Sequence, residues 1–132
     1  MTTIIVGLNV DITGGPQVNV PQVAIDVEAY DKIENKLSKG ETKIAVQPEN
    51  NEASFLLIKS SDYDPSGKLT YKPRGFEASP PPIHLDKPQI YLGAGAISSL
   101  LKDVTIITFT NNLDKEVSIE ILVGRDGNPP TS

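Results

Sequence analysis

The sequence predicts an all-β fold: an antiparallel β-sandwich or jelly roll of about eight to ten short strands with at most one short helix. Val, Ile and Thr make up 33 of the 132 residues, and these β-branched side chains favour pleated sheet over helix. Eleven prolines and ten glycines supply turn signals along the whole chain. The strand segments alternate apolar and polar residues, as strands with one covered face do.

The N-terminal part of the chain contains three extended segments. Ile4–Ile12 is predicted to be a strand that ends at the turn Thr13–Pro16. Val18–Val20 forms a short extended piece, which Pro21 confines to the edge of a sheet because proline donates no ladder hydrogen bond. Apolar and polar residues alternate through Val23–Val27, so this segment is predicted to be a half-buried strand.

The segment Glu28–Leu37 fits two structures. As a helix it would carry its apolar residues on one face, with acidic residues early, lysines late and Gly40 as the stop. As a strand it would form a hairpin with Thr42–Val46 through the turn Ser38–Glu41. Because Thr42–Val46 needs a neighbour in a sheet, we expect the hairpin.

The middle of the chain contains further short strands and one helical segment. Phe55–Ile58 is apolar on both faces, so we expect a central strand that is covered on both sides. The other expected elements are strands at Leu69–Lys72, Ile83–Leu85 and Gln89–Leu92 and a helical turn or two within Ala96–Lys102.

The last third of the chain predicts a β-ribbon whose two strands flank the polar loop Asn111–Glu116. The first run, Val104–Thr110, is apolar on both faces at its middle, so we expect it to be central and covered. The second run, Val117–Val123, alternates apolar with polar residues, so we expect it nearer solvent with one wet face. Leu122 interrupts that wet face, which makes it our candidate for a contact between subunits.

Composition limits the setting in which the protein works. We expect one domain spanning residues 1–132, with a flexible tail at residues 125–132. The formal net charge of −5 argues against a nucleic-acid partner, since phosphate binding depends on clustered lysines and arginines. The chain has no cysteine, no apolar run of the roughly 20 residues that span a bilayer, and no N-terminal signal pattern. We therefore expect a soluble, cytoplasmic protein without a membrane span.

One loop resembles the front half of a calcium-binding loop. Asp62, Asp64 and Ser66 supply oxygen atoms at the first, third and fifth positions, and Gly67 follows at the sixth. The twelfth position, where an acidic residue would close the coordination shell, is Pro73. Because Asp, Pro, Ser and Gly are also the ordinary turn residues, we expect a turn between two strands, with a calcium site as the alternative.

His84 is the only histidine of the chain, and it lies in a short apolar strand. An imidazole can act as a general base. However, the sequence has no Gly-x-Ser-x-Gly nucleophile pattern, and one histidine without cysteine does not make an ordinary zinc site. We therefore expect His84 to be structural.

These observations favour a noncatalytic structural or protein-interaction module that self-associates and needs no cofactor. The sequence presents no catalytic set, and its many potential edge strands invite pairing with another chain. Two alternatives stay open. One is a carbohydrate- or ligand-binding module assisted by calcium at Asp62, Asp64 and Ser66, and the other is a small hydrolase that uses His84.

Overall fold

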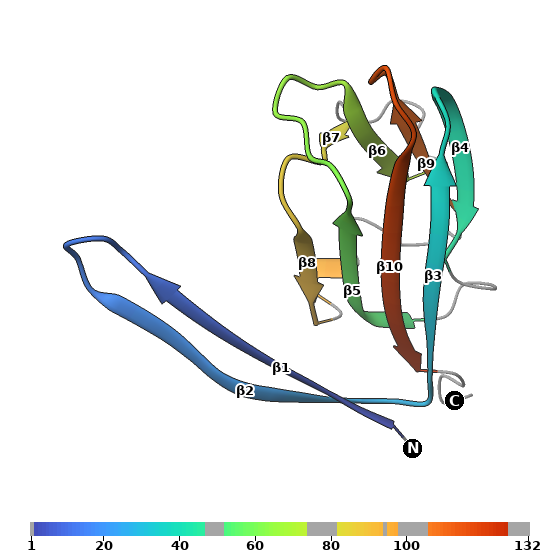
Figure 1. Cartoon of the computed structure of the whole chain (residues 1–132). Helices are drawn as coiled ribbons and strands as arrows, with labels where there is room; N and C mark the ends of the chain where they lie inside the picture. Colours follow the sequence, from blue (N-terminus) through green and yellow to red (C-terminus); the bar gives the residue numbers. More distant parts are fainter. Residues whose placement is uncertain (1, 47–51, 74–81, 94, 98–105, 127–132) are drawn as a thin grey trace.

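The structure of the protein, a computed structural model, describes residues 2–46, 52–73, 82–93, 95–97 and 106–126 (Figure 1). The described residues form ten β-strands in three antiparallel sheets, which confirms the predicted all-β class. The strands are β1 (Thr2–Asp11), β2 (Gln17–Val27), β3 (Ala29–Leu37), β4 (Gly40–Ala45), β5 (Glu52–Ser60), β6 (Leu69–Pro73), β7 (Ile83–His84), β8 (Gln89–Leu92), β9 (Ile106–Asn111) and β10 (Val117–Asp126).

Two four-stranded sheets form a sandwich. We call the sheet with strand order β3-β10-β5-β8 the front sheet and the sheet with order β4-β9-β6-β7 the back sheet. The four apolar residues that alternate along β10 all face the core and are at most 2% exposed. Phe109 of the back sheet packs against Tyr71 with ring centroids 5.5 Å apart. The core therefore lies between two sheets that each contribute their inward-facing residues.

The predicted ribbon of the last third is wrong in its pairing, although both strands exist. β9 pairs with β4 and β6 in the back sheet, whereas β10 pairs with β3 and β5 in the front sheet. The polar loop between them therefore crosses from one sheet to the other. β9 is central, as predicted, but β10 is central too, and its one wet face is confirmed by the exposed Ser118 and half-buried Glu120.

The buried side chain of Asn111 stabilises this loop as a crossing between the sheets. Its Oδ1 accepts a hydrogen bond from the Leu113 amide at 2.9 Å, and its Nδ2 donates to the Lys115 carbonyl at 3.0 Å. The same Nδ2 donates to the Leu37 carbonyl at 2.9 Å, at the end of β3. One amide side chain thus satisfies backbone groups that a crossing loop would otherwise leave unpaired.

The ambiguous segment Glu28–Leu37 is a strand for most of its length, but the hairpin expected from it is wrong. β3 pairs with β10 and β4 pairs with β9, so the connection between β3 and β4 also crosses between the sheets. Gly40 adopts a φ of 113°, a left-handed conformation that glycine tolerates and that lets the chain turn sharply here. The two crossings are neighbours, since Asn111 hydrogen-bonds to Leu37 and pairs with Gly40.

β1 and β2 form a two-stranded hairpin that projects away from the sandwich, which we call the arm (Figure 1). Its tip is a turn closed by a hydrogen bond from the Gly15 amide to the Ile12 carbonyl at 2.8 Å. Val18–Val20 lies on an edge strand, as predicted, because β2 has only one neighbour in a two-stranded sheet. It is not a separate piece, since β2 runs unbroken through Pro21. The chain accommodates Pro21 as part of a β-bulge, between Val20 and Val23.

Other expectations are met where the structure describes them. β5 lies between β10 and β8 as a central strand, as predicted, with Phe55, Leu56 and Ile58 buried. The expectation that both of its faces are covered is met only in part, because Leu57 on the outer face is half-buried. A helical turn occupies residues 95–97, whereas 98–102 of the expected helical segment and 104–105 of the first run lie outside the described residues. β10 extends into the expected tail as far as Asp126, and 127–132 again lie outside. No helix in the described ranges is long and apolar enough to cross a membrane.

Replacing Asn111 with Ala should lower the free energy of unfolding by about 2 to 4 kcal/mol, because it leaves several buried backbone groups unpaired. Urea denaturation followed by circular dichroism measures this change. Asn112→Ala is the matched control, since that side chain is exposed and the substitution should cost under about 0.5 kcal/mol. Equal losses in the two variants would contradict the role of Asn111.

Candidate functional site

One face of the arm is apolar along its whole length. Residues directly opposite each other in the β1–β2 register share a face, so the cross-strand pairs Ile4–Ile25, Val6–Val23, Leu8–Val20 and Val10–Val18 lie on the same side. With Val27, which pairs with Thr2, they form a nine-residue surface that we call the apolar face of the arm. It comprises Ile4, Val6, Leu8, Val10, Val18, Val20, Val23, Ile25 and Val27.

The β-bulge keeps this face continuous. Gly7 of β1 lies opposite two residues of β2, Pro21 and Gln22, because Val6 pairs with Val23 while Leu8 pairs with Val20. Without the extra residue, Val18 and Val20 would point to the other side, since a shift of one residue reverses every side chain of a strand. The bulge therefore places the apolar residues on both sides of Pro21 on one surface.

The outer half of the apolar face is uncovered. Leu8, Val10, Val18 and Val20 are between 37% and 50% exposed, whereas the aliphatic residues of the core are at most 5% exposed. A two-stranded hairpin with an exposed apolar face is at best marginally stable in water by itself. An uncovered apolar surface of this size is typical of a protein-interaction site.

The opposite face of the arm is polar and acidic. Thr3 Oγ1 donates a hydrogen bond to Asp26 at 2.9 Å, and the Gln17 amide donates to Asp11 at 2.6 Å. Ile5, which is 61% exposed, and its exposed partner Ala24 are apolar residues on this face. Residues 2–28 include the acids Asp11, Asp26 and Glu28 but no lysine or arginine.

The base of the arm rests on the outer face of the front sheet, the face that points away from the back sheet. A Cβ atom built on Gly124 would lie 2.6 Å from Ile4 Cδ1 and 3.1 Å from Val27 Cγ1. It would also lie 3.4 Å from Phe55 Cβ, on the neighbouring strand. Only glycine allows this close approach of the arm to β10. Val27 is fully buried in this contact, although it is not part of the sandwich core.

An apolar strip continues across the outer face beside this contact. Leu122 of β10 pairs with Leu57 of β5, which pairs with Ile90 of β8, so the three side chains lie on one line across the strands. We call these three residues the outer strip. Ile90 is 42% exposed, and Leu57 and Leu122 are half-buried. Leu122, the predicted subunit contact, thus lies at one end of this strip, next to Lys32 of β3.

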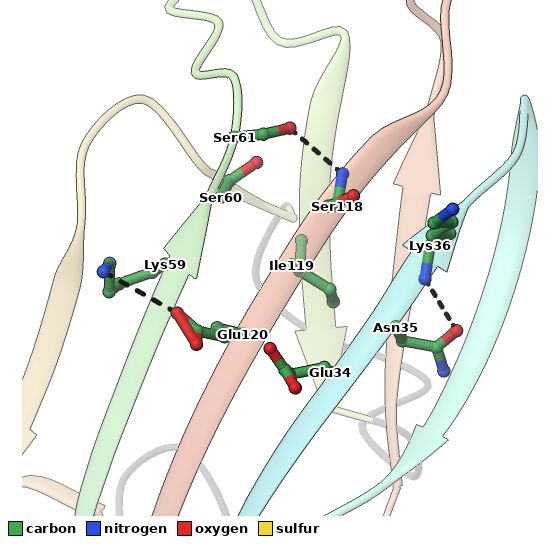
Figure 2. Close-up of a pocket in the computed structure, with 9 residues that line it drawn as sticks. All are labelled: Glu34, Asn35, Lys36, Lys59, Ser60, Ser61, Ser118, Ile119 and Glu120. Atoms are coloured by element: carbon green, nitrogen blue, oxygen red, sulfur yellow. Dashed lines mark hydrogen bonds and ion pairs between the residues drawn. The ribbon is translucent and has the colours of Figure 1, made fainter.

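The next residues along the same strands carry charges. Glu120 lies between two lysines, with its carboxylate 3.2 Å from Lys32 Nζ and 3.7 Å from Lys59 Nζ. The hydrogen bond and charge of Lys32 lower the pKa of Glu120. Figure 2 shows Lys59 reaching toward Glu120, with Glu34 on the neighbouring strand. This part of the outer face is an open depression of about 820 Å³, and all of the residues that line it except Ile119 are polar or charged.

The residues of the predicted calcium loop are divided between different contacts. Asp64 accepts hydrogen bonds from Ser66 Oγ at 2.6 Å and from the Lys68 amide at 2.8 Å, which lower its pKa. Asp62 instead forms an ion pair with Lys115 at 2.9 Å. The described residues include no cluster of three or more His, Cys, Asp or Glu side chains suited to a metal ion. The contacts are those of a turn, and calcium binding stays a prediction.

His84 lies on β7 at the edge of the back sheet and is exposed. Its ring lies over Gly67, where a Cβ atom would be 3.2 Å from Nε2 and Cε1. The side chain of Gln89 donates a hydrogen bond to the carbonyl of His84, not to the imidazole, at 2.8 Å. No hydrogen bond to the imidazole is seen within the described parts of the chain. The hydrolase role stays a hypothesis.

Tyr71 links the two sheets at their β8 and β7 side. Its hydroxyl lies 2.6 Å from the hydroxyl of Tyr91 on β8 and donates to the side chain of Gln89. Burial, together with Tyr91, raises the pKa of the Tyr71 phenol, so it stays protonated at neutral pH. These groups act as a structural connection between front and back sheets.

Comparison of the chain with protein-family models, curated proteins and solved structures found no match. The sequence identifies Leu122 but not the arm, because the alternating apolar residues of β1 and β2 match those of a half-buried strand in a sandwich. The available signal was the pair of valines on each side of Pro21, which only the bulge brings onto one face.

Replacing Gly124 with Val should lower the free energy of unfolding by about 1 to 3 kcal/mol, because the new side chain collides with Ile4 and Val27. Thermal and urea denaturation measure the change. Gly7→Val is the control, since a Cβ atom at Gly7 has no neighbour within 4 Å. If both variants lose the same stability, the close contact between arm and sheet does not exist.

Replacing Ser66 with Ala should raise the pKa of Asp64 toward its ordinary value, because the hydroxyl is the largest cause of the lowered pKa. The carboxyl chemical shift of Asp64, followed by NMR between pH 2 and 6, measures its titration in the wild type and in Ser66→Ala. A lowered pKa means that Asp64 stabilises the fold above its unfolded-state pKa and that this contribution is lost as the pH falls. Ser61→Ala, beside Asp62, should leave the Asp64 midpoint unchanged.

Proposed function

We propose that this protein is a noncatalytic structural module that self-associates through the apolar face of its arm. The observation that carries the proposal is a hairpin with nine aliphatic residues on one side, of which the four farthest from the sandwich are uncovered. Burying such residues is favourable by about 1.5 to 3 kcal/mol for each large aliphatic side chain. Covering the arm therefore provides the free energy for assembly.

A second copy of the chain is the partner that these features favour. Each copy carries two partly exposed apolar surfaces, the apolar face of the arm and the outer strip at Leu57, Leu122 and Ile90. Homo-oligomers are the commonest assemblies of proteins that carry such surfaces. The arm is also long enough to reach beyond its own sandwich (Figure 1).

The noncatalytic part of the proposal is supported by how the charged side chains are used. Glu120 is neutralised by Lys32 and Lys59 on an open sheet face, and Asp62 is paired with Lys115. A catalytic acid or base instead needs a partly enclosed position beside a bound substrate. The carboxylates in these ion pairs serve as surface and turn contacts.

Size-exclusion chromatography with light scattering should find assemblies of two or more 14.2 kDa chains at tens of micromolar. Leu8→Glu should weaken association by at least about tenfold, because 1.4 kcal/mol of lost burial corresponds to a factor of ten. Ile5→Glu, which places the same charge on the opposite face of the arm, should leave association within about threefold of wild type. A wild-type protein that is monomeric under these conditions would refute the proposal.

A further inference from the structure

We infer that the arm of one copy docks on the outer face of the front sheet of a second copy, at the strip formed by Leu122, Leu57 and Ile90. The inference rests on the proposed self-association and adds its geometry: the donor is the apolar face of the arm, and the acceptor is a different surface. Three observations carry it.

The first is that these two kinds of surface already meet within one chain. Ile4 and Val27, at the base of the arm, pack on the outer face at Gly124. Val27 is completely buried there. Beyond that contact the apolar face of the arm continues toward Leu8 and Val10. The outer face continues to Leu122, the next outward-facing residue of β10. The apolar face of the arm and the outer face of the front sheet thus both extend beyond the contact at Gly124.

The second observation is the direction of the arm. In Figure 1 it leaves the sandwich near the start of β3 and points away, with its tip far from the front sheet. The outer half of its apolar face therefore does not cover the outer strip of its own chain. Leu8, Val10 and Ile90 are each at least 41% exposed as a result. In a pair of copies, the arm of one chain can cover the outer strip of the other, which its own arm leaves uncovered.

The third observation is size. Ten residues of β1 span about 33 Å at about 3.3 Å per residue. The outermost strands of a four-stranded sheet are about 14 Å apart, since neighbouring strands are about 4.8 Å apart. An arm of this length can cross the whole outer strip from β10 to β8 while its base stays on its own sandwich.

Because donor and acceptor are different surfaces, variants in each should complement one another. Leu8→Glu damages the arm and leaves the outer strip intact, whereas Leu122→Glu damages the strip and leaves the arm intact. Each should associate at least tenfold more weakly than wild type. A 1:1 mixture should form a complex of one chain of each kind, because it pairs one intact arm with one intact strip. Analytical ultracentrifugation of the full chains, with one variant fluorescently labelled, measures this.

Two further variants keep the test interpretable. Ile90→Glu lies in the same strip at a more exposed position, so it tests the acceptor with less risk to folding. Ser118→Glu lies on the same strand and face as Leu122 but among polar residues, and it should associate like wild type. Circular dichroism melting curves show that each variant is folded before its mass is measured.

The outcomes separate this inference from the proposed function. Complementation in the mixture, together with loss in each single variant, supports docking of the arm on the strip. If Leu122→Glu and Ile90→Glu assemble like wild type, the acceptor is wrong and self-association through the arm still stands. If both single variants are monomeric and the mixture stays monomeric, donor and acceptor are not distinct surfaces, which overturns the inference. A monomeric wild type overturns both the inference and the proposed function.

Discussion

The alternation of side chains along β10 is the constraint on which the rest of the structure depends. One set of residues, Val117 to Val123 at every second position, fills the core, and the set between them forms the outer face. The strand is central in the front sheet, so a shift of its register by one residue would exchange the core residues and the outer-face residues. Leu122 and Gly124 interrupt the polar set: Gly124 leaves room for the arm, and Leu122 continues the apolar outer face that Leu57 and Ile90 form on the neighbouring strands.

Two neighbouring crossings hold the sheets together at one end of the sandwich. They follow β3 and β9, and the Asn111 side chain hydrogen-bonds within its own crossing and to the end of β3. At the β8 and β7 side, Tyr71 reaches from the back sheet to Tyr91 of the front sheet. A buried amide and a buried phenol are costly to leave unpaired, so each specifies one arrangement of the layers.

The sequence predicts what is local and misses what is not. Strand positions, the turn at Asp62 to Lys68 and the exceptional Leu122 follow from neighbouring residues, and the structure places a strand, a turn and an outward-facing leucine there. The choice of partner strand is not local, and the crossing that it requires is stabilised by Asn111, which in sequence is one polar residue at the start of a polar loop. The arm was missed for a similar reason, because alternation in β2 shows that one face is apolar but not which element covers it.

The arm and the sandwich core share no buried residue among those described, since the core cluster contains no residue of β1 or β2. Stability of the sandwich is therefore largely independent of whether the arm is covered. The arm is ordered by its own β1–β2 ladder, by its contact at Gly124 and by the hydrogen bond from the Glu28 amide to the Arg125 carbonyl, while Leu8, Val10, Val18 and Val20 remain partly exposed. A ligand that binds one state stabilises that state by mass action, and under the proposed self-association a second copy would act as that ligand. Ordering of the arm and assembly would then be one concentration-dependent equilibrium, while the folded sandwich persists on both sides of it.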